Sequence, residues 1–169
     1  MRRGLDRSCK NADLSGDLQA LLPQLVPLAV EWAERVAALG ALQGAQLTSE
    51  SAELARRVGV SAPERVRIAT SKPFPYPEHP LLRSAAMETG MLGPSMAGLT
   101  LGHTIFLDGL PSIRLLSHEL RHVAQYEAAG SIAAFLPAYL AQIVHFGYED
   151  APYEVDARQH EIHGERARA

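Results

Sequence analysis

The segment 117–126, which reads SHELRHVAQY, constrains this chain more than any other. Two histidines stand four residues apart in it, and a glutamate directly follows the first. On an α-helix, residues four apart lie on the same face, about one turn from each other. His118 and His122 can therefore bind one metal ion together, and Glu119 can reach a water molecule on that ion. The segment accordingly predicts a helix that carries a zinc site.

The surrounding residues predict a helix over 111–129. Pro111 and Ser112 are typical of a helix start, and Gly130 is typical of a stop. One face of this helix is apolar and is expected to pack on the core; it consists of Ile113, Leu116, Leu120, Val123 and Ala124. The opposite face is expected to border a cleft; it consists of His118, His122, Gln125 and Tyr126.

Two imidazoles leave a catalytic zinc ion one protein ligand short, because such sites usually have three protein ligands and a water. Cys9 is the only cysteine, so a site built from several thiolates is excluded. The third ligand is expected from a last helix over 152–166. Two faces of that helix compete: one holds Glu154, Arg158 and Glu161, and the other holds Asp156, His160 and His163. We select Glu154, and the Asp156/His160 face remains the alternative.

The remaining chain predicts a mostly helical α+β fold in which a short β-sheet packs on the metal-binding helix. Length and composition suit one domain, at 169 residues, 47% hydrophobic and 21% charged. We expect a flexible arm at 1–16 and a single domain over 17–169, with a helical support layer at 17–60 and the metal-binding core at 98–166. Further helices are expected over 17–42, 48–58, 81–91 and 132–146, and strands over 64–70 and 98–107.

Several partners are not expected. The net charge is −3 without a long basic run, which gives no reason to expect a nucleic acid. The apolar stretches 18–30 and 132–146 are interrupted by proline and polar residues and do not suit a membrane span. The N-terminus lacks the apolar segment of a signal peptide. The default expectation is a cytoplasmic protein, although export without a cleaved signal fits equally well. The sequence indicates no oligomeric state.

The motif resembles that of the gluzincin zinc peptidases, which combine His-Glu-x-x-His with a downstream glutamate on a separate helix. The chain is more closely similar to small bacterial domains with a minimal version of that core, such as the metallopeptidase-like core domain associated with extracellular contractile injection systems. The likeness covers about residues 98–160 and includes Thr100-Leu101-Gly102, His118 through Gln125, and the Glu-x-Asp-Ala segment at 154–157. Larger gluzincins have an aspartate four residues after the ligand glutamate, and this chain has Arg158 there.

The resemblance implies a zinc metallopeptidase that acts on a peptide or protein substrate. His118, His122 and Glu154 would bind Zn²⁺, and Glu119 would be the general base. Gln125 and Tyr126 would orient the ligands. The resemblance also implies that the segment 98–107 pairs with an extended substrate, with a protected strand as the alternative. The donor for the oxyanion stays open among Tyr148, Tyr153, His145 and Arg158. The competing interpretation of the chain is a non-catalytic module that keeps this fold as a structural, toxin or carrier component of a larger assembly.

Overall fold

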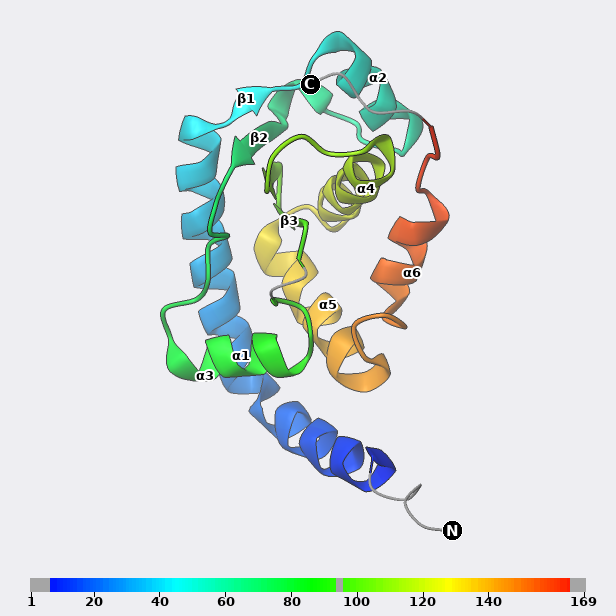
Figure 1. Ribbon diagram of the computed structural model, residues 1–169. Coiled ribbons are helices and arrows are strands. Elements are labelled where there is room, and N and C mark those ends of the chain that lie inside the picture. Colours follow the sequence, from blue (N-terminus) through cyan, green and yellow to red (C-terminus); the bar gives the residue numbers. More distant parts are fainter. Residues whose placement is uncertain (1–6, 94–95, 165–169) are drawn as a thin grey trace.

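The protein has a mostly helical α+β fold, as the sequence predicts. The computed structural model describes residues 7–93 and 96–164, and their side chains from residue 17 onward. In this part of the chain there are six α-helices: α1 (Arg7–Gln43), α2 (Ser49–Arg57), α3 (Pro80–Glu88), α4 (Ile113–Ala129), α5 (Ile132–Phe146) and α6 (Pro152–Gln159). They surround a four-stranded mixed sheet of β1 (Ala45–Gln46), β2 (Arg67–Thr70), β3 (Gly98–Leu101) and β4 (Thr104–Leu107) (Figure 1). A 3₁₀ turn, η1 (Pro63–Arg65), precedes β2.

The sheet has the strand order β1-β2-β4-β3, so β3 is an edge strand. β2 runs parallel to β4, with Ile68 opposite Ile105, and β3 runs antiparallel to β4. The expectation of one strand over 98–107 is therefore wrong, because the chain reverses at Gly102 and His103. Gly102 has a φ of +62°, a conformation that glycine adopts without steric cost and that two-residue hairpin turns require.

Helix α4 lies between two groups of core residues. Its expected apolar face is confirmed: Leu116, Leu120 and Val123 are buried and pack in the same cluster as Ile105 of β4. The opposite face is covered as well, because Tyr126 is buried and its ring centroid lies 4.1 Å from that of Phe135 in α5. The second cluster continues from there to α1 and α3. The histidine-bearing helix is thus held rigidly from both sides.

The ends of α4 form as the sequence predicts. The Ser112 hydroxyl oxygen accepts a hydrogen bond from the Leu115 N–H at 3.1 Å, which satisfies one of the free donors in the first turn. Gly130 ends the helix with a φ of +92°. These caps fix where α4 starts and stops and therefore the direction in which its histidines point.

Two other helices differ from the expected ranges. Helix α1 begins at Arg7 instead of Asp17. The sequence did not predict this earlier start, because the first ten residues of the helix carry few apolar side chains and show no apolar period. Residues 1–6 of the expected arm lie outside the described residues. Helix α6 ends at Gln159, and the chain from His160 to Gly164 is not helical. The expected helical faces of the C-terminal segment therefore do not extend to Glu161.

No described helix is by itself long and apolar enough to cross a membrane. Helices α4 and α5 meet the length and composition criteria only as a pair, and they are bent by 116° where they join.

Candidate metal centre

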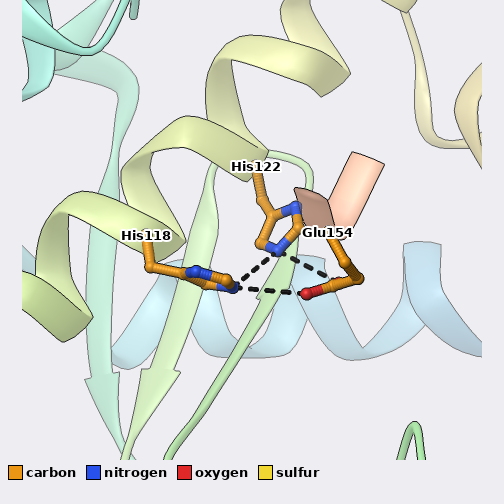
Figure 2. A group of neighbouring side chains, drawn as sticks. All are labelled: His118, His122 and Glu154. Atoms are coloured by element: carbon orange, nitrogen blue, oxygen red, sulfur yellow. Dashed lines mark hydrogen bonds and ion pairs between the residues drawn. The ribbon is translucent and has the colours of Figure 1, made fainter. Parts of the chain in front are cut away.

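Three side chains converge between α4 and α6: His118 and His122 from α4, and Glu154 from α6 (Figure 2). Their potential ligand atoms all lie within 4.8 Å of one another. Both histidines project from the same face of α4, and Glu154 reaches them from the first turn of α6. The structure thus brings together two histidines and a glutamate that could hold a metal ion, the group selected from the sequence.

The spacing of these atoms fits a tetrahedral ion. The two Nε2 atoms are 3.2 Å apart, His122 Nε2 is 3.3 Å from Glu154 Oε1, and His118 Nε2 is 3.4 Å from Glu154 Oε2. Zinc binds nitrogen and oxygen ligands at about 2.0–2.2 Å in tetrahedral geometry, which places two ligands about 3.3–3.6 Å apart. The three observed distances, of which the two to Glu154 end on different carboxylate oxygens, are close to this range, so a zinc ion could lie between the two histidines and the carboxylate.

The other ring nitrogen of His122 makes a hydrogen bond that prepares Nε2 to bind a cation. His122 Nδ1 lies 2.8 Å from Gln125 Oε1. The Gln125 amide donates to the Tyr153 carbonyl at 2.9 Å and to Asp156 Oδ2 at 2.7 Å, so its oxygen is the atom that faces His122. Nδ1 of His122 therefore carries a proton, and Nε2 faces His118 and Glu154. Gln125 thus contacts one of the two histidines of the group.

His118 is oriented in the same way by a carboxylate. Its Nδ1 lies 3.1 Å from Glu161 Oε1, and Arg114 binds the other oxygen of Glu161. Burial raises the pKa of Glu161, but the Arg114 guanidinium outweighs burial and holds the pKa below its usual value. Glu161 is thus an ionised acceptor at neutral pH and fixes the proton of His118 on Nδ1. The two Nε2 atoms face each other 3.2 Å apart beside the Glu154 carboxylate. A metal ion bound between them would take the place of the protons that these nitrogens otherwise carry.

Glu154 is 1% exposed and has an unsatisfied atom. The Tyr139 hydroxyl donates to Oε1 at 2.6 Å, while Oε2 has no hydrogen-bond partner among the described residues. Burial raises the pKa of this carboxyl group, but the neighbouring imidazoles of His118 and His122 and the Tyr139 hydroxyl outweigh it and hold the pKa far below its usual value. A cation bound at Oε2 would give this buried oxygen the partner it lacks, and the donor set therefore fits a metal ion.

Glu119 lies beside this group, and its carboxylate is held by β3. The Thr100 hydroxyl donates to Glu119 Oε2 at 2.7 Å, and the Glu119 side chain is buried. The other oxygen, Oε1, lies against Gly98, where an added Cβ would come within 2.4 Å of it. Any side chain at position 98 would collide with this oxygen. One oxygen of Glu119 is therefore anchored, and glycine at 98 leaves room for the other.

The centre opens into a polar cleft of about 680 Å³ between α4, α6 and the start of β3. His118, Glu119 and Glu154 line it together with Tyr148. Tyr148 is buried enough that its pKa lies above the usual value, first because of burial and then because of the nearby carboxylates of Glu154 and Glu119. Its phenol is therefore protonated at neutral pH and available as a donor.

The other oxyanion candidates have other partners. The Tyr153 ring packs on Phe135 at 4.7 Å between centroids, and His145 packs against Phe146 on the surface. Arg158 also lines the cleft, but its guanidinium donates to the Glu149 carbonyl. Among the four residues that the sequence left open, Tyr148 is thus the one whose side chain both lines the cleft and interacts with the carboxylates of the site.

The alternative face of α6 does not supply a ligand, but it supports the site. Asp156 accepts hydrogen bonds from Arg121 at 2.7 and 3.1 Å and from Gln125. Burial raises its pKa, but Arg121 and Gln125 outweigh burial and keep the pKa below its usual value. His160 contacts the Asp156 backbone carbonyl, 2.8 Å from its Nδ1. One face of α6 therefore places Glu154 in the group, and the other face places Asp156 where it holds Gln125, which contacts His122.

Sequence reasoning missed Tyr139 and Thr100. Tyr139 lies in the apolar helix α5, and Thr100 lies in a strand that could equally have had this side chain facing solvent. Neither belongs to a local motif, and each reaches its carboxylate only through packing of distant elements. The one available signal was the Thr-Leu-Gly segment at 100–102.

Tyr126, expected to orient a ligand, instead packs in the core against Phe135.

Comparison of the chain with protein-family models, with curated proteins and with solved structures found no match. The function therefore has to be argued from the geometry of the centre itself, which is a buried His-His-Glu group able to hold a metal ion.

Proposed function

We propose that this protein is a zinc-dependent peptidase in which His118, His122 and Glu154 bind the ion and Glu119 is the general base. The observation that carries the proposal is the convergence of two Nε2 atoms and the Glu154 carboxylate, at distances of 3.2–3.4 Å from one another, next to the Glu119 carboxylate, which is not part of this group. A structural zinc site is usually closed by a fourth protein ligand. This one presents three ligands and borders a cleft, which favours catalysis.

A zinc ion bound here supplies a water of near-neutral pKa and polarises a carbonyl group. The protein's own residues provide the proton transfers. Thr100 holds Oε2 of Glu119, which leaves Oε1 as the atom that takes a proton from the attacking water and returns it to the leaving amine. The Tyr148 hydroxyl is the donor we assign to the developing oxyanion. Strand β3, at the edge of the sheet, is the element we assign to pair with an extended peptide.

The test uses the purified full-length protein and a mixed peptide library. We expect about one zinc per chain and cleavage of peptides that stops with a chelator and returns with zinc. The variant Glu119→Gln keeps the shape of the side chain but removes the base, so it should retain zinc and lose activity by about 10²–10⁴-fold. Glu88→Gln, an exposed glutamate on α3, is the matched control and should be fully active.

The outcomes separate the interpretations. Equal cleavage by Glu119→Gln and the unchanged protein would show that Glu119 is not the base. Bound zinc without cleavage of any peptide would favour the non-catalytic module, because the ion would then only stabilise the fold. Absence of zinc binding at micromolar concentration would refute both the metal centre and the peptidase.

A further inference from the structure

The two carboxylate oxygens of Glu154 differ in their surroundings, although they lie at nearly the same distance from the histidines. Oε1 is 3.3 Å from His122 Nε2, and Oε2 is 3.4 Å from His118 Nε2. By these distances alone, either oxygen or both could contact an ion between the rings. The Tyr139 hydroxyl donates to Oε1 at 2.6 Å, whereas Oε2 has no hydrogen-bond partner among the described residues. Tyr139 therefore makes the two oxygens unequal.

Aromatic packing fixes the direction of the Tyr139 hydroxyl. Tyr139 stands four residues after Phe135 in α5, so the two rings lie on the same face of the helix. They stack with centroids 5.2 Å apart and an angle of 28° between the ring planes. Phe135 is buried, and its ring also packs on Tyr126 of α4 at 4.1 Å and on Tyr153 of α6 at 4.7 Å. The Tyr139 ring is thus held against a residue that three helices share.

The number of Glu154 oxygens on a bound ion decides whether the site is open or closed. Zinc usually takes four ligands, and a catalytic site has three from the protein and one from water. Two imidazoles and one carboxylate oxygen leave a position free, whereas two carboxylate oxygens would fill it. A hydroxyl that donates to a carboxylate at about 2.5–2.7 Å makes a hydrogen bond about twice as strong as one between neutral groups. The oxygen that receives it is the poorer metal ligand, because the hydroxyl proton competes with the ion for its electrons.

We propose, on the basis of the peptidase function above, that Tyr139 restricts Glu154 to one metal-binding oxygen, Oε2, and so keeps one position on the zinc ion open for water. Tyr139 is then a positioning residue, since it acts through a ligand. This role has a consequence that mere support of the site does not have. Loss of the hydroxyl should leave zinc bound and fill the open position, whereas loss of ordinary support for a ligand weakens metal binding by about 10–100-fold.

The variant Tyr139→Phe tests this role in the full-length protein, because it keeps the ring on Phe135 and removes the hydroxyl. Its zinc affinity should equal or exceed that of the unchanged protein, while kcat should fall by about tenfold or more. Tyr76→Phe is the matched control: it makes the same chemical change in the loop between β2 and α3, where the ring lies 5.3 Å from the Arg83 guanidinium. It should alter neither quantity.

Two further measurements do not depend on catalysis. With cobalt in place of zinc, azide should bind at the open position of the unchanged protein and change the visible absorption of the metal; Tyr139→Phe should bind azide about tenfold more weakly. The infrared difference between the zinc-loaded and the chelated unchanged protein reports the carboxylate directly. Its two stretching bands move apart when one oxygen binds an ion and move together when both do, and we expect them to move apart.

Failure of this role and failure of the peptidase function give different results. Equal azide affinity and equal kcat for Tyr139→Phe and the unchanged protein would overturn the role of Tyr139 and leave the peptidase intact. Zinc affinity that falls about 10–100-fold without a change in azide affinity would also overturn it. Weaker azide binding by Tyr139→Phe, in a protein that cleaves no peptide, would retain the role of Tyr139 and overturn the peptidase. If thermal unfolding shows that Tyr139→Phe is not folded, the infrared bands of the unchanged protein decide, and bands that move together would overturn the role.

Discussion

Thr100 donates a hydrogen bond that fixes the Glu119 carboxylate from outside helix α4. Its hydroxyl lies 2.7 Å from Oε2 and both residues are buried, so water does not replace the bond readily when it is lost. If Glu119 is the base, Thr100→Val should therefore lower kcat. A hydrogen bond to a charged group contributes about 1.5–3 kcal/mol, which corresponds to about a ten- to hundredfold loss in rate.

Zinc content and kcat of the Thr100 variants check this prediction. Thr100→Val should bind zinc normally, because the Thr100 hydroxyl bonds to Glu119 and not to the three proposed ligands. Thr100→Ser keeps the hydroxyl and should retain most of the activity. A kcat of Thr100→Val equal to that of the unchanged protein would mean that Glu119 needs no support from β3.

At the residue scale, the members of the centre differ in how far the sequence could predict them. His118, Glu119 and His122 follow from helical spacing, since one helix fixes their relative positions. Glu154 required a choice between two faces of a later helix. Thr100 and Tyr139 could not be predicted, because each meets its partner only after the sheet and α5 have packed on α4 and α6.

At the element scale, Glu127 fastens the end of α4 to two loops. Its carboxylate accepts hydrogen bonds from the Ser61 N–H at 2.6 Å and the Ala62 N–H at 3.1 Å, and it lies 2.9 Å from His103 Nε2 in the β3–β4 turn. Burial raises the pKa of Glu127, but the Ser61 N–H, His103 and the Ala62 N–H outweigh burial, and the pKa lies below its usual value. This carboxylate holds α4 in position from its C-terminal end.

The lowered pKa gives a pH dependence with a definite sign. The Glu127 carboxylate binds protons more weakly in the folded protein, so its stabilisation is complete above the unfolded pKa of about 4.3 and is lost as pH falls through the folded pKa. Glu127→Gln should lower the free energy of unfolding by about 1–3 kcal/mol at pH 7. The difference from the unchanged protein should shrink at pH 3.

Urea unfolding at both pH values measures this difference, with Glu34→Gln on the exposed side of α1 as the control. A deficit of Glu127→Gln that is the same at pH 7 and pH 3 would show that the charge of Glu127 contributes nothing.

The elements also show where sequence patterns stop being informative. The caps of α2 and α4 could be predicted from Thr48, Ser112 and Gly130, because the capping hydrogen bonds are local. The hairpin at 98–107 was missed, since its apolar residues continue through the turn and only Gly102 marks it. The start of α1 was missed for the opposite reason, because its first residues carry no apolar period.

At the scale of the whole molecule, the N-terminal half has more than a supporting role. Helix α1 extends along the side of the molecule and contributes Trp32 and Ala29 to an apolar cavity beside the centre (Figure 1). The sequence alone suggested only a support layer at 17–60, because apolar helix faces look the same whether they fill a core or surround a cavity. The expected division of the chain into an arm and one domain stays a prediction.

The metal centre also links parts of the chain that are far apart, and this predicts how zinc affects stability. His118 and His122 come from α4, whereas Glu154 comes from α6, and the whole of helix α5 separates the two in the chain. These three side chains therefore meet only in the folded protein. Zinc at 100 times its Kd should stabilise the folded state by about 2.7 kcal/mol. For a chain of 169 residues this raises Tm by about 5–10 °C.

The variant Glu154→Gln should lower Tm in chelator and should lower it further in zinc. Without metal, the lowered pKa of Glu154 means that its carboxylate stabilises the folded protein through His118, His122 and Tyr139, and a neutral amide loses that stabilisation. In zinc the variant also loses a ligand, so its zinc-dependent rise in Tm should be smaller than that of the unchanged protein. Thermal unfolding of both proteins under both conditions measures this difference, and an equal zinc-dependent rise in Tm for the two would place the ion away from Glu154.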